Sequence, residues 1–213
     1  MKRHLLLLGA LAIALAGNAQ RSSIGITGGG GFSWMSNTGH NLDKHASYNG
    51  GLTYVYSSET HWGLGVDVKY SREGAKYEYP GVLGGILSNV TNKTYSYTSD
   101  ADYIRVPLRA IYFFNKYDKA VRPNISLGPS FGFLTGGTIS NSQNNNKDNV
   151  TDYYKKFDFG LQATAGASFR LATALWLTAD IAYYQGLIKQ NINGSNNMMN
   201  GNLVLNLGLR IGI

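Results

Sequence analysis

The end of the chain, NLVLNLGLRIGI, alternates between large apolar side chains and polar or small ones. A period of two residues is that of a β-strand, whose successive side chains point to opposite faces. In a water-soluble protein these leucines would face a core. In a membrane barrel they would face lipid, and Arg210 would face the lumen. The remaining sequence has to decide between these two interpretations.

Seven further segments alternate in the same way, so eight strands are predicted. They cover residues 23–34, 48–57, 61–72, 101–114, 122–134, 154–171, 174–187 and 202–213. Their lengths suit tilted membrane-spanning strands of about 9 to 11 residues with extensions. Long and short connections take turns between them, and the long ones cover residues 35–47, 73–100, 135–153 and 188–201. This pattern predicts an all-β fold, an eight-stranded antiparallel up-and-down transmembrane β-barrel.

On the apolar face of the predicted strands, aromatic and aliphatic residues occupy different levels along the barrel axis. If the first strand runs outward from the periplasm, aromatic residues fall near both ends of the strands, and aliphatic residues such as Leu64, Leu127 and Leu205 fall between them. Amphipathic rings favour the headgroup level of a bilayer, whereas a soluble core has no reason to sort them. The predicted aromatic girdles contain Trp34, Tyr56, Trp62, Tyr70, Tyr112, Phe114, Phe131, Phe133, Phe157, Phe169 and Tyr183.

The opposite face carries charges of both signs. The predicted lumen charge network contains Asp67, Lys69, Arg105, Arg109, Asp158, Arg170, Asp180 and Arg210. A charge in a narrow lumen needs a partner, and Asp180 on the neighbouring strand is expected to pair with Arg210. Because the interior of an eight-stranded barrel is just wide enough for side chains to fill, we expect a filled lumen and no general diffusion channel. A narrow path remains an alternative.

The first 19 residues predict a cleaved signal peptide, which leaves residues 20–213 as one barrel domain. Lys2 and Arg3 precede an apolar run from Leu5 to Ala16, and small residues follow at Gly17 and Ala19. An N-terminal membrane anchor is the alternative. No later apolar run is long enough for a transmembrane helix. Charged residues make up 15% of the chain, against about 25% in a typical soluble domain, which fits a large surface outside water.

Candidate chemistry changes this picture little. The chain has no cysteine, and its net charge of +7 is not clustered with aromatic residues, so neither thiol chemistry nor nucleic acid is expected. His40 and His45 flank Asp43 and could hold a metal or orient a nucleophile, but solvated loop residues are the simpler interpretation. The GGGG stretch lacks the Lys-Ser/Thr of a phosphate-binding loop and is interpreted as strand curvature. We therefore predict no catalytic residue, no metal and no cofactor. A lipid-modifying enzyme and a soluble lipocalin-like binder remain alternatives.

The sequence resembles a known family in five blocks. In order along the chain they are DYIRVPLRAIYFF, ISLGPSFGFL, DFGLQATAGASFRL, LWLTADIAYYQGL and NLVLNLGLRIGI. The sequence resembles the outer-membrane β-barrel domain family of Bacteroidota, with its PorT-like and porin-family small barrels. The resemblance covers about residues 22–213 and is most specific at residues 103–108 and 128–132. It implies a cell outer-membrane location and an eight-stranded barrel, and it implies no reaction.

The long outer loops suggest how such a barrel could act. Four tyrosines of the connection 73–100 (Tyr77, Tyr79, Tyr95 and Tyr97) suit adhesive contacts. The leading interpretation is a structural or surface-binding barrel, with a narrow pore as the alternative. Deleting residues 141–149 should abolish binding but leave a pore intact. The expected partners are outer-membrane lipid, lipopolysaccharide, the barrel-assembly machinery and a surface ligand, and a monomer is expected because a closed barrel has no free edge.

Overall fold

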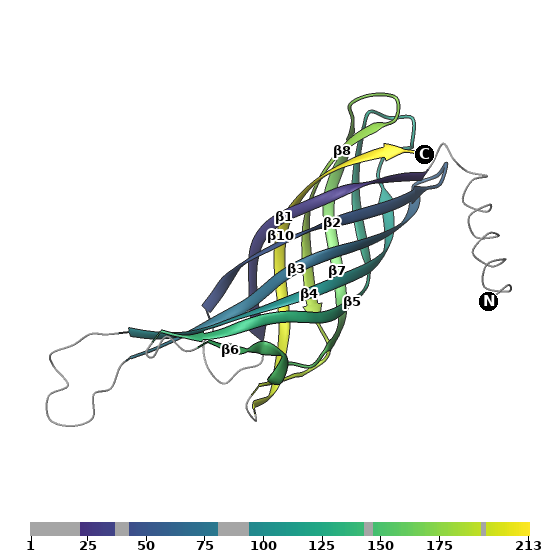
Figure 1. Cartoon of the computed structure of the whole chain (residues 1–213). Coiled ribbons are helices and arrows are strands. Elements are labelled where there is room, and N and C mark those ends of the chain that lie inside the picture. The colour runs from purple at the N-terminus through teal and green to yellow at the C-terminus, as the bar shows by residue number, and fades with distance from the viewer. Residues whose placement is uncertain (1–21, 37–42, 81–93, 143–146, 193–194) are drawn as a thin grey trace, which may run out of the picture.

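In the computed structural model, residues 22–36, 43–80, 94–142, 147–192 and 195–213 are described. Eight long antiparallel strands form a tilted barrel (Figure 1), and two short strands and a 3-10 helix lie at one end. The long strands are β1 (Ser22–Ser36), β2 (Asp43–Ser57), β3 (Trp62–Pro80), β4 (Thr94–Phe113), β5 (Val121–Asn141), β7 (Phe157–Arg170), β8 (Leu175–Gly186) and β10 (Ser195–Gly212). The short elements are β6 (Lys147–Asn149), η1 (Val150–Asp152) and β9 (Gln190–Ile192). The predicted signal peptide lies outside the described residues and stays a prediction.

The barrel closes where its first strand meets its last. Each long strand pairs with its neighbour in sequence, and β1 also pairs with β10 from Ser23 opposite Gly212 to Ser36 opposite Met199. The GGGG stretch lies in β1 at this seam. A Cβ atom on Gly29 would lie 2.1 Å from the Leu205 carbonyl oxygen, so the two backbones approach too closely there for a side chain. Gly31 approaches the Leu203 carbonyl oxygen in the same way, so these two glycines allow the barrel to close.

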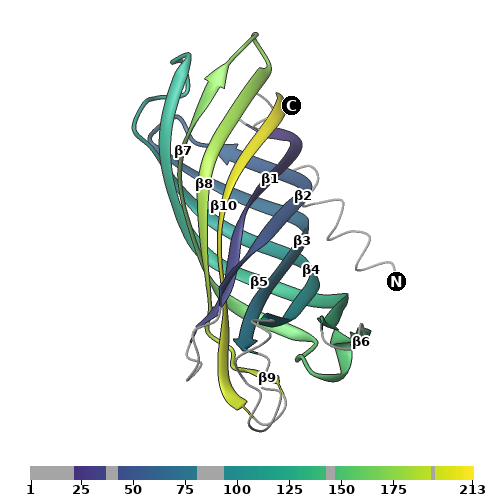
Figure 2. The same ribbon diagram turned by 90° about the vertical axis from the view of Figure 1, so that its left-hand side faces the viewer.

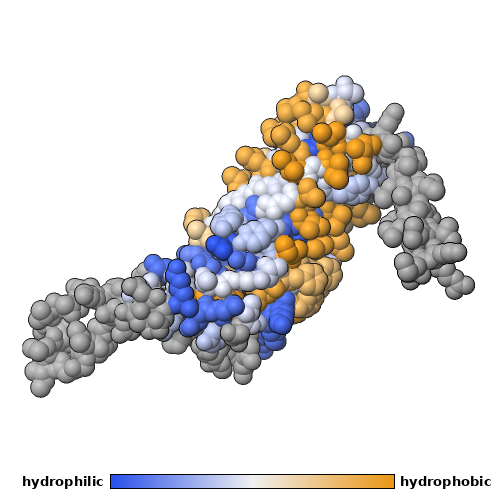
Figure 3. Space-filling model, viewed as in Figure 1, coloured by the Kyte–Doolittle hydropathy of each residue, from blue (hydrophilic) through white to orange (hydrophobic). Residues whose placement is uncertain are grey.

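The barrel is inside-out compared with a soluble protein. Large aliphatic side chains cover its outer surface: Leu64 is 64% exposed and Leu207 is 59% exposed. Polar side chains fill the interior, where Asp67 and Asp158 are 1% and 0% exposed. In Figure 3 the hydrophobic surface gathers over the half of the barrel where β1 begins and β10 ends, and the hydrophilic surface gathers toward the other end. The leucines of β10 thus face outward and Arg210 faces the lumen, which excludes the lipocalin-like alternative.

The two ends of the barrel differ in length. Short turns join the strands at the end where β1 begins and β10 ends, and the strands project much farther at the other end (Figures 1 and 2). Outer-membrane barrels have short periplasmic turns and long external extensions. The end where β1 begins and β10 ends is therefore called the inner end, and the other the outer end. Among the described residues, no helix is long and apolar enough to cross a bilayer.

The long connections predicted from the sequence are largely strands, which is the main correction to the predicted fold. The β3–β4 ladder runs on to Pro80 opposite Thr94, and β5 continues to Asn141, where β6 pairs with it. Residues 71–80, 94–102 and 135–141 together with β6 therefore continue the strands beyond the outer aromatic level, and they are here called the outer sheet. At about 3.3 Å per residue, residues 71–80 reach roughly 30 Å. The sixth predicted strand was also wrong at its start, because β7 begins at Phe157 and not at residue 154.

Candidate functional site

The strongest cluster of charges lies inside the barrel toward its outer end. The Arg105 guanidinium donates from Nε to one Glu73 oxygen and from Nη2 to the other, at 2.6 Å for the second contact. The same Nη2 also donates to Asp158 at 2.9 Å. All three side chains are at most 5% exposed. This outer lumen cluster, Glu73, Arg105 and Asp158, joins β3, β4 and β7 across the interior.

Neutral polar side chains satisfy the remaining acceptors of this cluster. Asp158 also accepts hydrogen bonds from the Tyr184 hydroxyl at 2.9 Å, from Asn200 Nδ2 at 2.9 Å and from Gln190 Nε2 at 3.2 Å. The guanidinium carbon of Arg105 lies 3.9 Å from the centre of the Tyr184 ring, within cation–π range. A buried ion pair stabilises a protein only when its other hydrogen-bonding groups are satisfied. The outer lumen cluster largely meets that condition.

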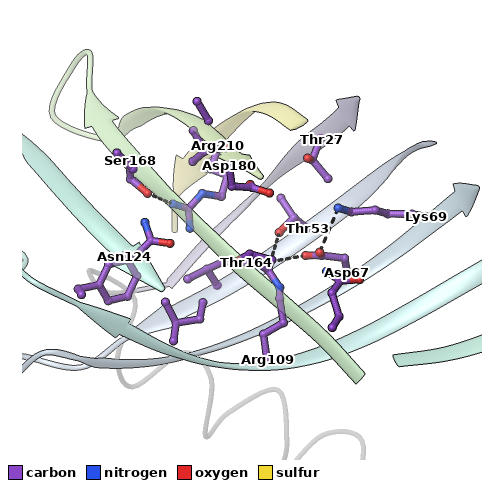
Figure 4. A pocket seen from close by; sticks show the side chains of 17 residues that line it. Thr27, Thr53, Asp67, Lys69, Arg109, Asn124, Thr164, Ser168, Asp180 and Arg210 are labelled. Carbon is purple, nitrogen blue, oxygen red and sulfur yellow. Dashed lines mark hydrogen bonds and ion pairs between the residues drawn. The ribbon is translucent and has the colours of Figure 1, made fainter. Parts of the chain in front are cut away.

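A second cluster lies at mid-height, around Asp67. Arg109 donates to Asp67 at 2.7 Å and Lys69 lies 3.4 Å from it, so one carboxylate from β3 balances two cations (Figure 4). Asp180 is in a different network, where it accepts a hydrogen bond from Asn206 Nδ2 at 2.9 Å. Asp67, Lys69, Arg109 and Asp180 all line the same small lumen cavity.

The expected pairing of Arg210 with Asp180 is wrong as a direct contact. Arg210 donates to the hydroxyls of Ser23 at 3.2 Å and of Ser168 at 2.8 Å, and no carboxylate of the described residues forms an ion pair with it. The strand register explains the difference, since Asp180 lies opposite Asn206 and Arg210 lies opposite Trp176. Arg210 is therefore four residues nearer the inner end than the carboxylate expected to meet it.

Two more arginines close the inner end by stacking on aromatic rings. Arg122 lies 3.7 Å from the centre of the Phe113 ring and donates to Ser57 at 3.1 Å. Arg170 lies 4.6 Å from the Trp176 ring and donates to backbone carbonyls of the turn between β4 and β5. Neither arginine has a carboxylate partner among the described residues. The interior is thus richer in carboxylates toward the outer end and in arginines toward the inner end.

Little space remains between these layers. Two lumen cavities of about 30 Å³ each are present, one around Asp67 and Arg210 and one beside Arg105. Each is large enough for a water molecule or two. Figure 4 shows the first of them, with side chains pointing into it from several strands. The described side chains leave no room in these cavities for a solute much larger than water.

The outer end is covered by a small apolar lid. The 3-10 helix η1 places Val150 and the following Tyr154 over the barrel mouth, where they are 0% and 4% exposed. They pack with Met35, Ala75 and Ala101. This packing explains why residue 154 is not in a strand: its side chain is buried in the lid, and its hydroxyl lies 2.7 Å from that of Ser99. Burial raises the pKa of Tyr154, so its hydroxyl stays neutral.

The structure places the aromatic residues of both predicted girdles on the outside of the barrel, partly or well exposed. Rings contact each other across neighbouring strands at each level. Trp34 and Tyr183 have centroids 6.0 Å apart at the outer level, and Trp62 and Tyr112 have centroids 5.2 Å apart at the inner level. Phe131 and Phe133 lie beside Phe159 and Phe157, while Tyr56, Tyr70, Phe114 and Phe169 complete the two levels.

Above the outer girdle, polar groups are paired on the outer sheet. Arg72 donates to both oxygens of Asp102, at 2.6 and 2.9 Å, and these hydrogen bonds hold the pKa of Asp102 below its usual range. His45 lies 2.8 Å from Asp100, so it pairs across the sheet. His40 and the side chain of Asp43 lie outside the described part of the chain. Among the described residues, no group of three or more possible metal ligands occurs.

Several lumen residues were missed at the sequence level. Glu73 was assigned to a connection, although it continues the inward series of Asp67 and Lys69 by two further steps. Arg122 was placed at a strand start without a role, and Tyr184 lies one position from a predicted girdle residue. The alternation within the predicted strands already places Arg122 and Tyr184 on the inward face, and continuing it two steps beyond Lys69 would have found Glu73.

An inside-out antiparallel barrel with aromatic girdles and a filled polar lumen is the architecture of an integral outer-membrane protein. The sequence matches the family described as outer membrane protein beta-barrel domain over residues 18–190, and the chain belongs to that family. No curated protein sequence matches it.

Solved structures agree on the fold. The chain is similar to Neisserial surface protein A, at 15% identity and a TM-score of 0.52, over 90% of this chain and 96% of that one. It is also similar to the outer membrane protein OprG from Pseudomonas aeruginosa, at 14% identity and a TM-score of 0.51, over 91% and 96% of the two chains. At these identities the likeness establishes the barrel fold. The protein is thus an integral β-barrel of the outer membrane.

Proposed function

We propose that this barrel is a non-enzymatic surface-binding protein that contacts an anionic polymer outside the cell through its outer end. The observation that carries the proposal is the contrast between the two parts of the molecule. The lumen is filled by charge clusters and covered by the lid, whereas the outer sheet extends well beyond the barrel wall. Such an extension adds contact surface and contributes nothing to a pore.

The charge of the outer end favours an anionic ligand. Among the side chains that the structure describes at this end, five lysines and one aspartate, Asp148, are exposed. The backbone N–H of Lys155 donates to the Gln190 side chain at 3.1 Å, which places Lys155 and Lys156 near Lys189. Lys155, Lys156 and Lys189 are here called the lysine rim. A local excess of positive charge attracts anionic partners from solution. The other exposed lysines described at the outer end are Lys44 and Lys147.

Two finer assignments belong to the same proposal. We place the protein among the PorT-like small barrels of Bacteroidota, on the support of the sequence blocks at residues 103–108 and 128–132. We also expect it to act as a monomer inserted by the barrel-assembly machinery, in contact with lipopolysaccharide, because β1 and β10 pair along their length and close the wall.

The test is binding of dextran sulfate to cells that display the protein, with neutral dextran as the reference. Replacing the lysine rim with glutamine should lower dextran sulfate binding by about tenfold, and added salt should weaken binding by the wild type. The matched control is Lys116→Gln with Lys119→Gln, since both lysines are exposed at the inner end. Equal binding by wild type and rim variant would contradict the proposal, as would equal binding of neutral dextran.

The lysine substitutions test surface binding more specifically than the deletion of residues 141–149 does. Asn149 caps η1 through a hydrogen bond to the Thr151 N–H at 3.0 Å, and β6 pairs with β5. The deletion would therefore disturb the lid as well as the surface.

A narrow water or proton path is the second candidate function. It is favoured by the two lumen cavities and by buried Nε groups of Arg109 and Arg210 that have no protein partner, since water would satisfy them. Planar-bilayer conductance separates the two candidates. The binding proposal expects no resolvable channel opening, and steady single-channel currents would favour the path.

A further inference from the structure

An apolar groove of about 460 Å³ lies on the lipid-facing wall of the barrel, across β3, β4 and β5. Its walls are the outward side chains of Leu64, Leu108 and Leu127, which are 64%, 43% and 57% exposed. Its floor contains Ala110 and Pro129. The volume falls in the range of sites for small molecules, which is about 300 to 1,000 Å³.

The groove arises from small residues set between large ones. Ala110 on β4 lies opposite Leu64 on β3 and opposite Leu127 on β5. A methyl group therefore sits between two leucine side chains at one height, and the wall is lower there than on either side.

Two prolines also interrupt the strand pairing beside the groove. The β4–β5 ladder passes from Pro107 opposite Ser130 directly to Ala110 opposite Leu127, and the β3–β4 ladder has its gap at the two preceding residues of β4, Val106 and Pro107. Proline has no N–H to donate to a ladder. A break in two adjacent ladders places the groove at a local irregularity of the wall, where lipid meets less regular backbone.

The depth of the groove selects one leaflet. On β4, Ala110 lies two residues from Tyr112, and on β3, Leu64 lies two residues from Trp62; both aromatic residues belong to the inner girdle. Two residues correspond to roughly 7 Å along a strand. The groove therefore begins just above the periplasmic headgroup level, in the half of the bilayer formed by phospholipid acyl chains.

We propose that this groove is a binding site for one acyl chain of an inner-leaflet phospholipid. Its lining offers apolar side chains to the chain, and Trp62 and Tyr112 flank the level of the headgroup. Aromatic rings at that level hold the polar part of a lipid while the groove takes the apolar part. A lipid chain held in this depression should exchange more slowly than a chain on a flat part of the wall.

The substitution Ala110→Leu fills the floor of the groove and leaves the lumen untouched. The matched control is Ala165→Leu, which makes the same exchange at an exposed, outward-facing alanine of β7 between Ile125 and Ile181. Ala165 does not line the groove. Ala110→Val is the milder variant, and it should give an intermediate result if Ala110→Leu folds poorly. Folding of each variant is checked on a gel, where the folded, unheated protein migrates faster than the boiled, unfolded protein.

The measurement is native mass spectrometry of the full protein released from nanodiscs of phosphatidylethanolamine and phosphatidylglycerol. The wild type and Ala165→Leu should retain one phospholipid. Ala110→Leu should retain it about tenfold less, the change expected from losing about two buried methylene contacts. Equal retention by wild type and Ala110→Leu would overturn the proposal, as would a wild type that retains no lipid.

Two further outcomes would show that a molecule other than an inner-leaflet phospholipid occupies the groove. In discs that also contain lipid A, retention of lipid A in place of phospholipid would contradict the assignment to the inner leaflet. A protein dimer that Ala110→Leu abolishes would show that a second copy covers the groove. These readouts are independent of ligand binding at the outer end, so failure of either proposal leaves the other intact.

Discussion

Asp158 offers the sharpest test of how the lumen is held together. Its side chain is fully buried and accepts hydrogen bonds from Arg105, Tyr184, Asn200 and Gln190. The substitution Asp158→Ala removes all four contacts and one charge. Breaking a buried ion pair costs about 3 to 5 kcal/mol. Arg105 keeps both contacts to Glu73, which limits that loss, while three neutral donors lose an acceptor at about 1 kcal/mol each.

We therefore expect Asp158→Ala to lower the free energy of unfolding by about 4 kcal/mol. Asp158→Asn keeps the shape and one acceptor oxygen, so about half that loss is expected. The assay is urea unfolding in lipid vesicles, followed by fluorescence of the three tryptophans. Asp118→Ala serves as the control, since that carboxylate is 67% exposed in an inner turn, and it should change stability by less than about 0.5 kcal/mol. A loss below about 1 kcal/mol for Asp158→Ala would refute the view that this cluster holds the lumen together.

Two other substitutions test the remaining layers. Arg210 has no carboxylate partner among the described residues, so Arg210→Met should lower the free energy of unfolding by less than about 1 kcal/mol or raise it. Arg105→Met should lower it by about 3 kcal/mol. Equal losses for the two variants in urea titrations would contradict this distinction. In the outer sheet, Gly137 has a φ of 140° and a Cβ atom there would lie 2.1 Å from the Asp100 carbonyl oxygen. Gly137→Ala should therefore destabilise the sheet by about 1 to 3 kcal/mol and speed its cleavage in limited proteolysis. The adjacent Gly136 has open space around its Cα, so Gly136→Ala should behave like the wild type.

The barrel wall could be predicted from the sequence because lipid imposes a rule on every spanning residue. One face must be apolar, and the narrow lumen makes the other polar, so alternation alone identifies β10 and assigns Arg210 to the inside. The outer sheet was not predicted from the sequence, because this rule does not apply outside the membrane. Beyond the headgroups neither face has to be apolar, so residues 71–80 lose the hydropathy period although the strand continues.

The partners within the lumen were harder to predict than the residues themselves. Parity identifies which side chains point inward, but the distance between two of them depends on the stagger of the strands. Asp180 and Arg210 lie on adjacent strands, and still the register sets them four residues apart. Glu73 reaches Arg105 because β3 continues past the membrane, which no count of spanning residues could show. The lid around Val150 and Tyr154 depends on a loop folding back, and local sequence carries no signal for that return.

The glycine-rich seam has a consequence for assembly. The ladder that closes the wall joins β1 to β10, so β1 must keep one edge unpaired until β10 has been made. Contacts between residues so distant in sequence form late, because the chain entropy of closing the intervening segment opposes them. Along Gly28 to Gly31 that waiting edge carries no side chains. The stretch that looks least informative in the sequence thus makes the final step of barrel closure sterically possible, because Gly29 and Gly31 leave room for the backbone of β10.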